Sequence, residues 1–132
     1  MISINKTMRI TTEESRCLSR ARKSLGRPVS QFVQAGVVEA AHKLGFFVRG
    51  RPTKPYRGTW PDAPDRGGES TSGRITVTFD EATLDLIDGA AQYLEVGETA
   101  FILGATFRYL ADLKKARPEY KDLFVPPKYL AG

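Results

Sequence analysis

Two stretches of the chain alternate between apolar and polar residues. They cover residues 6–10 and 75–79, and alternation of this kind predicts a β-strand with one buried face. Met8 and Ile10 fall on the apolar face of the first stretch, and Ile75, Val77 and Phe79 fall on that of the second. The opposite faces carry hydrogen-bonding side chains: Asn5, Thr7 and Arg9 in the first strand, and Arg74, Thr76 and Thr78 in the second.

Each strand is followed by two segments with helical spacing. Apolar residues form one stripe on each first helix: Leu18, Ala21 and Leu25 after the first strand, and Leu84, Ile87, Ala90, Ala91 and Leu94 after the second. We expect Thr12 and Asp80 to cap these helices. Turns at residues 26–29 and 95–98 lead to second helices, at about residues 31–44 and 100–115, with Ser30 and Thr99 as their caps. The second helices are apolar over much of their circumference, so we expect them at the centre of the fold.

The two halves of the chain repeat this pattern with an offset of 69 residues. Apolar positions coincide without a gap over residues 5–45, and the pairs include Met8 with Val77, Leu18 with Ile87, Phe32 with Phe101 and Leu44 with Leu113. A unit of about forty residues cannot bury its own apolar face, so two such units must pack together. We therefore expect one domain over residues 1–132, made of a unit at 5–45, a linker at 46–73, a second unit at 74–115 and an irregular tail at 116–132.

Charge is distributed unevenly along the chain. Residues 1–60 hold 12 Lys and Arg against 3 Asp and Glu, whereas residues 61–132 hold 8 against 12, and the whole chain carries +5. A basic half beside an acidic half indicates contact with a polyanion, carried mainly by the first half. The hydrophobic content of 41% and the absence of a long apolar run favour a cytoplasmic protein that does not enter a membrane.

The sequence offers little for catalysis. Cys17 is the only cysteine and fits a small buried thiol, while the only histidine, His42, fits an ordinary surface or capping position. Asp85 and Asp88 lie on a predicted exposed helix face without companions that would complete a metal site. We therefore expect a protein that is not an enzyme and that needs no cofactor or metal.

The order of strand, capped helix, turn and second helix resembles the ribbon-helix-helix DNA-binding proteins of the Arc, MetJ and CopG type. Those proteins usually form homodimers in which one strand from each chain builds an antiparallel ribbon that enters the major groove of double-stranded DNA. The resemblance implies a mainly α-helical fold with a two-stranded antiparallel ribbon, in which both units of one chain form an intramolecular pseudo-dimer. It places Thr7 opposite Thr76, Arg9 opposite Arg74 and Asn5 opposite Thr78. We also expect Lys6 on the inward face, opposite Phe79.

The resemblance also implies phosphate contacts at the start of each second helix, where backbone amides and the helix dipole attract an anion. Arg27 and Ser30 suit this role in the first unit, and we add Thr99 and Lys6 as further phosphate contacts. Glu95 and Glu98 would repel a phosphate in the second unit. Docking on DNA is therefore expected to be asymmetric, and a fused pair can read a non-palindromic site.

The linker and the tail suggest additional contacts. The linker is rich in Pro and Gly, and four of its basic residues are candidates for contacts with the DNA backbone: Arg49, Arg51, Lys54 and Arg57. Leu123, Phe124 and Tyr129 in the tail either pack onto the domain or bind a protein partner.

The sequence is compatible with two functions. The first is a double-stranded DNA-binding protein, acting as a transcriptional regulator or as an accessory factor in plasmid or T-DNA transfer, with one or several copies assembling on the DNA. The second is a protein-interaction module, such as an antitoxin or an accessory subunit, whose tail binds a protein partner. The acidic second unit favours the interaction module, whereas the paired arginines favour DNA.

Overall fold

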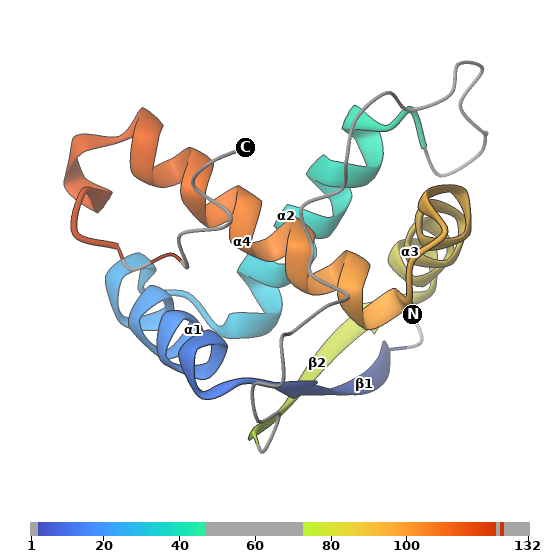
Figure 1. The fold of residues 1–132 in the computed structure, drawn as a ribbon, viewed down its shortest axis with the longest axis horizontal. Coiled ribbons are helices and arrows are strands. Elements are labelled where there is room, and N and C mark those ends of the chain that lie inside the picture. Colours follow the sequence, from blue (N-terminus) through green and yellow to red (C-terminus); the bar gives the residue numbers. More distant parts are fainter. Residues whose placement is uncertain (1–2, 47–72, 124, 126–132) are drawn as a thin grey trace.

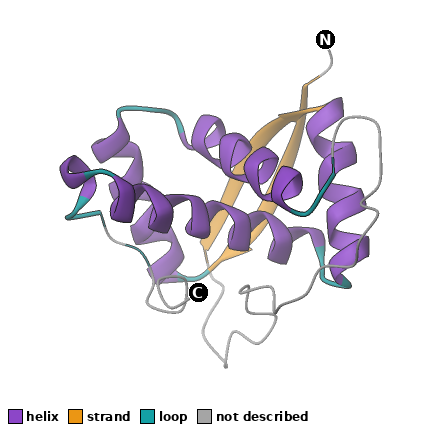
Figure 2. Cartoon of the chain, turned by 90° about the horizontal axis from the view of Figure 1, so that it is seen from above, coloured by secondary structure: helices purple, strands orange, loops and turns teal. Residues whose placement is uncertain are grey.

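The chain folds into a mainly helical structure with a two-stranded antiparallel sheet. The computed structural model describes residues 3–46, 73–123 and 125. In these ranges the elements follow in the order β1 (Ser3–Ile10), α1 (Thr12–Leu25), α2 (Val29–Lys43), β2 (Gly73–Asp80), α3 (Glu81–Leu94), α4 (Glu98–Ala116) and a short 3₁₀ helix (Pro118–Tyr120). The two strands form a ribbon at one edge of the molecule, with α2 and α4 crossing over it and α1 and α3 on either side (Figure 1). Seen from above, the helices lie over one face of the ribbon (Figure 2).

The register of the ribbon agrees with the prediction. Thr7 lies opposite Thr76, Arg9 opposite Arg74 and Asn5 opposite Thr78. Both strands are longer than the alternation predicted, because pairing continues to the ends of Ser3–Ile10 and Gly73–Asp80.

One detail of the register was predicted wrongly. Lys6 lies opposite Val77, and the partner of Phe79 is Ile4. In an antiparallel pair the two residue numbers change in opposite directions along the ribbon. With Thr7 opposite Thr76, Lys6 must therefore lie opposite Val77.

The cap of α1 is one residue earlier than predicted. Thr11 adopts the extended backbone of an N-cap, and its Oγ1 accepts a hydrogen bond of 3.1 Å from the backbone N–H of Glu14. The Glu14 carboxylate accepts in return from the Thr11 N–H at 2.8 Å, which completes a capping box. Thr12 is instead the first residue of the helix. At the other end, Gly26 takes the left-handed conformation with φ of 63° and closes α1.

Asp80 caps α3, as predicted. Its Oδ1 accepts a hydrogen bond of 2.7 Å from the backbone N–H of Thr83, and its Oδ2 accepts from Gln34 Nε2 at 3.3 Å. Hydrogen bonds from Thr83, and to a smaller extent the one from Gln34, hold the pKa of Asp80 below its ordinary value of 3.8. The side chain thus ends β2, starts α3 and contacts α2.

The second helix of each half starts earlier than the sequence indicated. The N-caps are Pro28 for α2 and Gly97 for α4, and neither makes a side-chain cap. Ser30 and Thr99 therefore lie within the first helical turn, and their predicted role as caps is wrong. Pro28 explains the first case, because its φ of −60° already suits the entry to a helix and it has no N–H to satisfy.

The centre of the core is the crossing of α2 with α4. Its largest fully buried side chains come mainly from these two helices and include Phe32, Val33, Val37, Phe101, Ile102, Phe107 and Leu110. The predicted stripes of α1 and α3 cover it from the sides, with Leu18, Ala21, Ile87 and Ala90 buried. The inward face of the ribbon closes it from below with Met8, Ile10, Val77 and Phe79.

Segments next to the two units also join this core. Phe46 is buried and meets Tyr93 of α3 edge to face, with ring centroids 5.5 Å apart. Leu123 and Val125 are buried as well, and the preceding 3₁₀ helix contacts α4. The start of the tail therefore packs onto the domain. No helix within the described ranges combines the length and apolar character needed to cross a membrane.

The crossing depends on a close approach at Gly36. A Cβ at this position would lie 3.0 Å from Tyr109 Cβ, 3.2 Å from Ala105 O and 3.3 Å from Thr106 Cα, so most of its neighbours are backbone or the root of a side chain. We predict that Gly36→Ala lowers the free energy of unfolding by about 1 to 3 kcal/mol, as overpacking of a core does. Urea unfolding followed by circular dichroism measures this change. An increase of about 1 kcal/mol, which helix propensity alone would give, would show that the helices can separate at low cost.

The cap at Asp80 makes stability depend on pH. A carboxylate with a lowered folded pKa stabilises the protein above its unfolded pKa, and this contribution is lost as the pH falls through the folded pKa. Asp80→Asn keeps an oxygen for the cap but does not titrate. We predict that unfolding midpoints in urea fall more for the wild type than for Asp80→Asn as the pH drops from about 6 to about 3. If the unfolding midpoints of the two proteins fall in parallel with pH, the charge of Asp80 does not contribute to stability.

Candidate nucleic-acid interface

The outward face of the ribbon carries the six side chains that the alternation predicted. All six side chains are exposed: Asn5, Thr7, Arg9, Arg74, Thr76 and Thr78. On the opposite face of the ribbon, Met8 and Ile10 of β1 and Val77 and Phe79 of β2 are buried. Since the helices cover the other face, these six side chains form a continuous polar surface. We call this set the ribbon face.

Hydrogen bonds between the strands order the ribbon face. The Thr7 and Thr76 hydroxyl oxygens lie 2.9 Å apart at its centre. On one side of this pair, Thr78 Oγ1 donates to Asn5 Oδ1 at 2.8 Å. On the other side, Arg9 and Arg74 are direct cross-strand partners. The surface thus has a pair of hydroxyls at its centre, an amide and a hydroxyl at one end, and two guanidinium groups at the other.

The start of α2 lies beside the ribbon. Ser30 Oγ accepts a hydrogen bond of 3.2 Å from the backbone N–H of Thr78, so the first turn of the helix is held to the edge of β2. A hollow between the end of α1 and the start of α2 has three cationic residues in its lining, Arg22, Lys23 and Arg27. The sequence predicted Arg27 and Ser30 near each other at this helix start. It did not predict the bond between Ser30 and the strand.

The start of α4 is different. Its first residue, Glu98, forms an ion pair with Lys6 of β1, with the Nζ and Oε2 atoms 2.7 Å apart. Thr99 follows in the same turn and is half-buried. Lys6, predicted as a phosphate contact, therefore already has a carboxylate partner within the chain. A lysine on an otherwise apolar strand face was the signal for such a partner, but which carboxylate would reach it depends on the tertiary fold.

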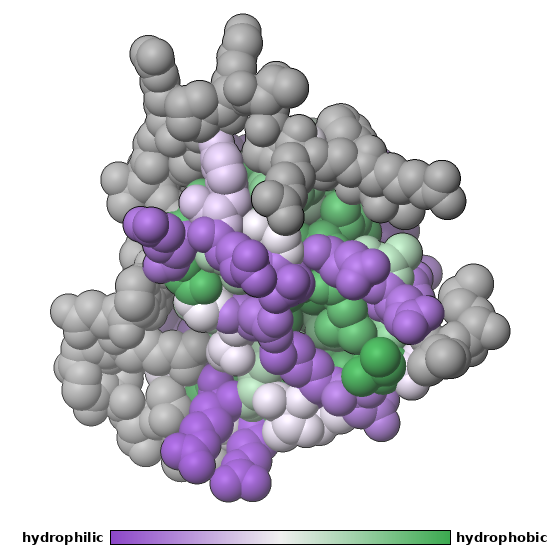
Figure 3. All heavy atoms as spheres, turned by 90° about the vertical axis from the view of Figure 1, so that its right-hand side faces the viewer, coloured by the Kyte–Doolittle hydropathy of each residue, from purple (hydrophilic) through white to green (hydrophobic). Residues whose placement is uncertain are grey.

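The two helices beside the ribbon carry opposite charge. The exposed residues of α1 and the turn after it include Arg16, Arg20, Arg22, Lys23 and Arg27. The exposed residues of α3 and its C-cap include Glu81, Asp85, Asp88 and Glu95. Hydrophilic side chains form a band across the side of the molecule that α3 occupies (Figure 3). The charge asymmetry of the sequence thus becomes a basic and an acidic side of one molecule.

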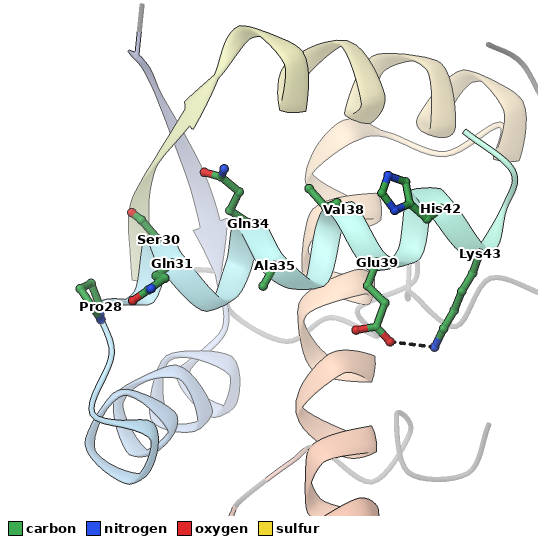
Figure 4. A pocket seen from close by; sticks show the side chains of 9 residues that line it. All are labelled: Pro28, Ser30, Gln31, Gln34, Ala35, Val38, Glu39, His42 and Lys43. Atoms are coloured by element: carbon green, nitrogen blue, oxygen red, sulfur yellow. Dashed lines mark ion pairs between the residues drawn. The ribbon is translucent and has the colours of Figure 1, made fainter. Parts of the chain in front are cut away.

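A second hollow follows the exposed face of α2. It is lined by Pro28, Ser30, Gln31, Gln34, Ala35, Val38, Glu39, His42 and Lys43 (Figure 4). Its charged residues pair within the chain, since Lys43 Nζ lies 3.0 Å from Glu39 and 3.4 Å from Asp112 of α4. Among the described residues, no group of three or more His, Cys, Asp or Glu side chains could hold a metal ion.

Cys17 is fully buried in α1, as expected for a structural thiol. Burial raises its pKa to about 12, and the nearby Glu13 and Glu14 act in the same direction. The thiol is therefore protonated at neutral pH, and a protonated thiol is a poor nucleophile.

Several predicted contact residues lie outside the part of the chain that the structure describes. They are Arg49, Arg51, Lys54 and Arg57 of the linker and Phe124 and Tyr129 of the tail. Leu123 of the tail is inside that part, and it packs onto the domain.

Comparisons with protein-family models, with curated proteins and with solved structures found no match to this chain.

The ion pair between Lys6 and Glu98 can be tested by a double-mutant cycle. At low salt, Glu98→Gln should lower the free energy of unfolding by up to about 1 kcal/mol, because both partners are partly exposed and solvent screens the attraction. In a Lys6→Met background the same substitution should have almost no effect. Urea unfolding of the four proteins gives the coupling energy. Equal effects of Glu98→Gln in both backgrounds would mean that the pair does not stabilise the fold.

Proposed function

We propose that this protein binds double-stranded DNA by placing the ribbon face in the major groove. The observation that carries the proposal is the pairing of Arg9 with Arg74 on an exposed strand face. Like charges directly opposite each other destabilise a sheet in isolation. A polyanionic partner reverses this cost, since guanidinium groups bind phosphates and guanine edges.

The dimensions and chemistry of the ribbon support the same partner. The major groove admits a two-stranded β-ribbon, and the bases display their hydrogen-bonding groups there. The ribbon face offers an amide, three hydroxyls and two guanidinium groups in one ordered row. Such side chains match the groups that base edges present.

The proposal includes a tandem ribbon-helix-helix arrangement, with the two halves of the chain as a pseudo-dimer. In a two-fold arrangement, equivalent residues meet near the axis. Thr7 bonds to Thr76, and Lys43 pairs with Asp112; in both cases the partners are 69 residues apart, which is the offset of the sequence repeat. The contacts at the ribbon and between α2 and α4 thus support one common axis.

The starts of α2 and α4 suggest that the two halves of the chain contact the phosphates of the DNA backbone differently. The start of α2 combines exposed Arg27 with Ser30, whose hydroxyl hydrogen can still be donated after its oxygen has accepted from Thr78. The start of α4 carries Glu98, whose charge is matched by Lys6 inside the chain. A phosphate is therefore attracted to the first half and gains little from the second.

This DNA binding serves either transcriptional regulation or an accessory role in the transfer of plasmid or T-DNA. Both begin with occupation of a duplex. A tail that captures a protein partner is supported less well, because Leu123 and Val125 are buried in the domain's own core.

The test is DNA affinity as a function of salt. We predict that the wild type binds a labelled mixed-sequence duplex and that Arg9→Ala/Arg74→Ala weakens binding at every salt concentration. The slope of log K against log salt should fall in magnitude by up to about 2, the number of cations removed from the interface. Fluorescence anisotropy measures both quantities.

Lys115→Ala/Lys121→Ala is the matched control. It removes the same charge from the far end of α4 and the segment after it, away from the ribbon (Figure 1). This variant should keep most of the affinity and the slope of the wild type. If the two double variants behave alike, or if folded wild type does not bind DNA at low salt, the proposed function is wrong.

A further inference from the structure

The ribbon face has two unlike ends, and the cause lies in the repeat. With the offset of 69 residues, the equivalent of Arg9 in the second half is Thr78, and the equivalent of Arg74 in the first half is Asn5. The two arginines therefore occupy different positions within their halves. Because the strands run antiparallel, these two positions meet, and both guanidinium groups emerge at the same end. A ribbon from two identical units would instead have the same residues at both ends.

The end with Asn5 and Thr78 is neutral and already bonded within itself. Asn5 Oδ1 accepts from Thr78 Oγ1, which fixes the amide with its nitrogen on the side away from that hydroxyl. A carboxamide that reads adenine uses its oxygen and its nitrogen together, accepting from N6 and donating to N7. Since Thr78 already occupies one of the two acceptor sites of the Asn5 oxygen, the amide is less suited to this two-bond contact.

The start of α2 lies at this neutral end as well, because Ser30 holds the backbone of Thr78. The basic turn with Arg27 precedes that helix start. This end therefore combines a weakly selective strand pair with the helix start that attracts phosphate.

The end with Arg9 and Arg74 contains donors only. A guanidinium has five N–H donors and no acceptor. In the major groove, guanine presents two acceptors, O6 and N7, whereas adenine presents one acceptor beside a donor, thymine presents one acceptor beside a methyl group, and cytosine presents a donor. Two adjacent guanidinium groups therefore fit neighbouring guanines better than any other pair of bases.

We infer that the ribbon reads a non-palindromic duplex site with neighbouring guanines under the Arg9 and Arg74 end. The inference rests on the proposed function, since it assumes that the ribbon face lies in the major groove. Asn5 and Arg9 are separated by four residues, or about 14 Å along an antiparallel strand. This length corresponds to about four base-pair steps of 3.4 Å, so the guanines lie at one side of the site and the weakly specified pairs at the other.

The experiment selects duplexes from a randomised library with the full-length wild type and sequences those that bind. The enriched sites should contain adjacent guanines on one side only. The Arg9→Ala/Arg74→Ala variant should lose this guanine preference, whereas Asn5→Ala should keep it and alter the choice of base at the other side. Lys115→Ala/Lys121→Ala, which changes net charge away from the ribbon, should select the same sites as the wild type.

A second measurement tests the acceptor directly. Replacing the selected guanines by 7-deazaguanine removes the N7 acceptor and keeps Watson–Crick pairing. Anisotropy titrations should then show a loss of affinity of roughly 10-fold for the wild type, and little change for the Arg9→Ala/Arg74→Ala variant.

The outcomes separate the inference from the proposed function. Salt-sensitive binding by the wild type without a base preference, with a palindromic site, or with full tolerance of 7-deazaguanine would overturn the inference and leave DNA binding intact. In that case the arginines contact phosphates only. No binding of any duplex by folded wild type at low salt would overturn both.

Discussion

The antiparallel pairing of β1 with β2 is the constraint on which the rest of the structure depends. Within the described ranges each strand has only the other as its partner, so the backbone hydrogen bonds of the sheet are all made between the two halves of the chain. A two-stranded ribbon is marginally stable in water by itself. Here its apolar face closes the core that α2 and α4 form, and its polar face is left exposed. The same pairing therefore completes the core and builds the candidate site.

This pairing was predicted from the resemblance of the repeated strand-helix-turn-helix pattern to ribbon-helix-helix proteins, and sequence periodicity supplied the repeat. The offset of 69 residues makes Thr7 and Thr76 equivalent positions, and the resemblance placed them opposite each other, while the alternation separated the six outward residues from the buried ones. Both signals depend on many positions at once, so an error at one of them changes little. Lys6 interrupts the apolar face of β1 without shifting the register.

The features that the sequence missed depend on single atoms. Thr11 and Thr12 both have a side chain that can cap a helix, and the reciprocal bond with Glu14 selects Thr11. Ser30 is a residue type that often caps helices, yet its hydroxyl oxygen accepts a hydrogen bond from Thr78 of β2, 48 residues away in the sequence. The pairing of Lys6 with Glu98 spans 92 residues. The contacts of Ser30 and Lys6 join segments far apart along the chain, so no local pattern contains them, whereas the capping box of Thr11 and Glu14 is itself a local pattern.

The placement of both strands in one chain has a consequence for how the ribbon assembles. Residues that pair across it are 63 to 77 positions apart, so closing the ribbon requires the chain to bring distant segments together. The entropy cost of that closure rises only slowly with the length of the intervening segment. Long-range pairing of this kind slows folding more than it reduces stability. Because the encounter is intramolecular, the fraction of molecules with a formed ribbon does not change on dilution, unlike that of a ribbon assembled from separate subunits.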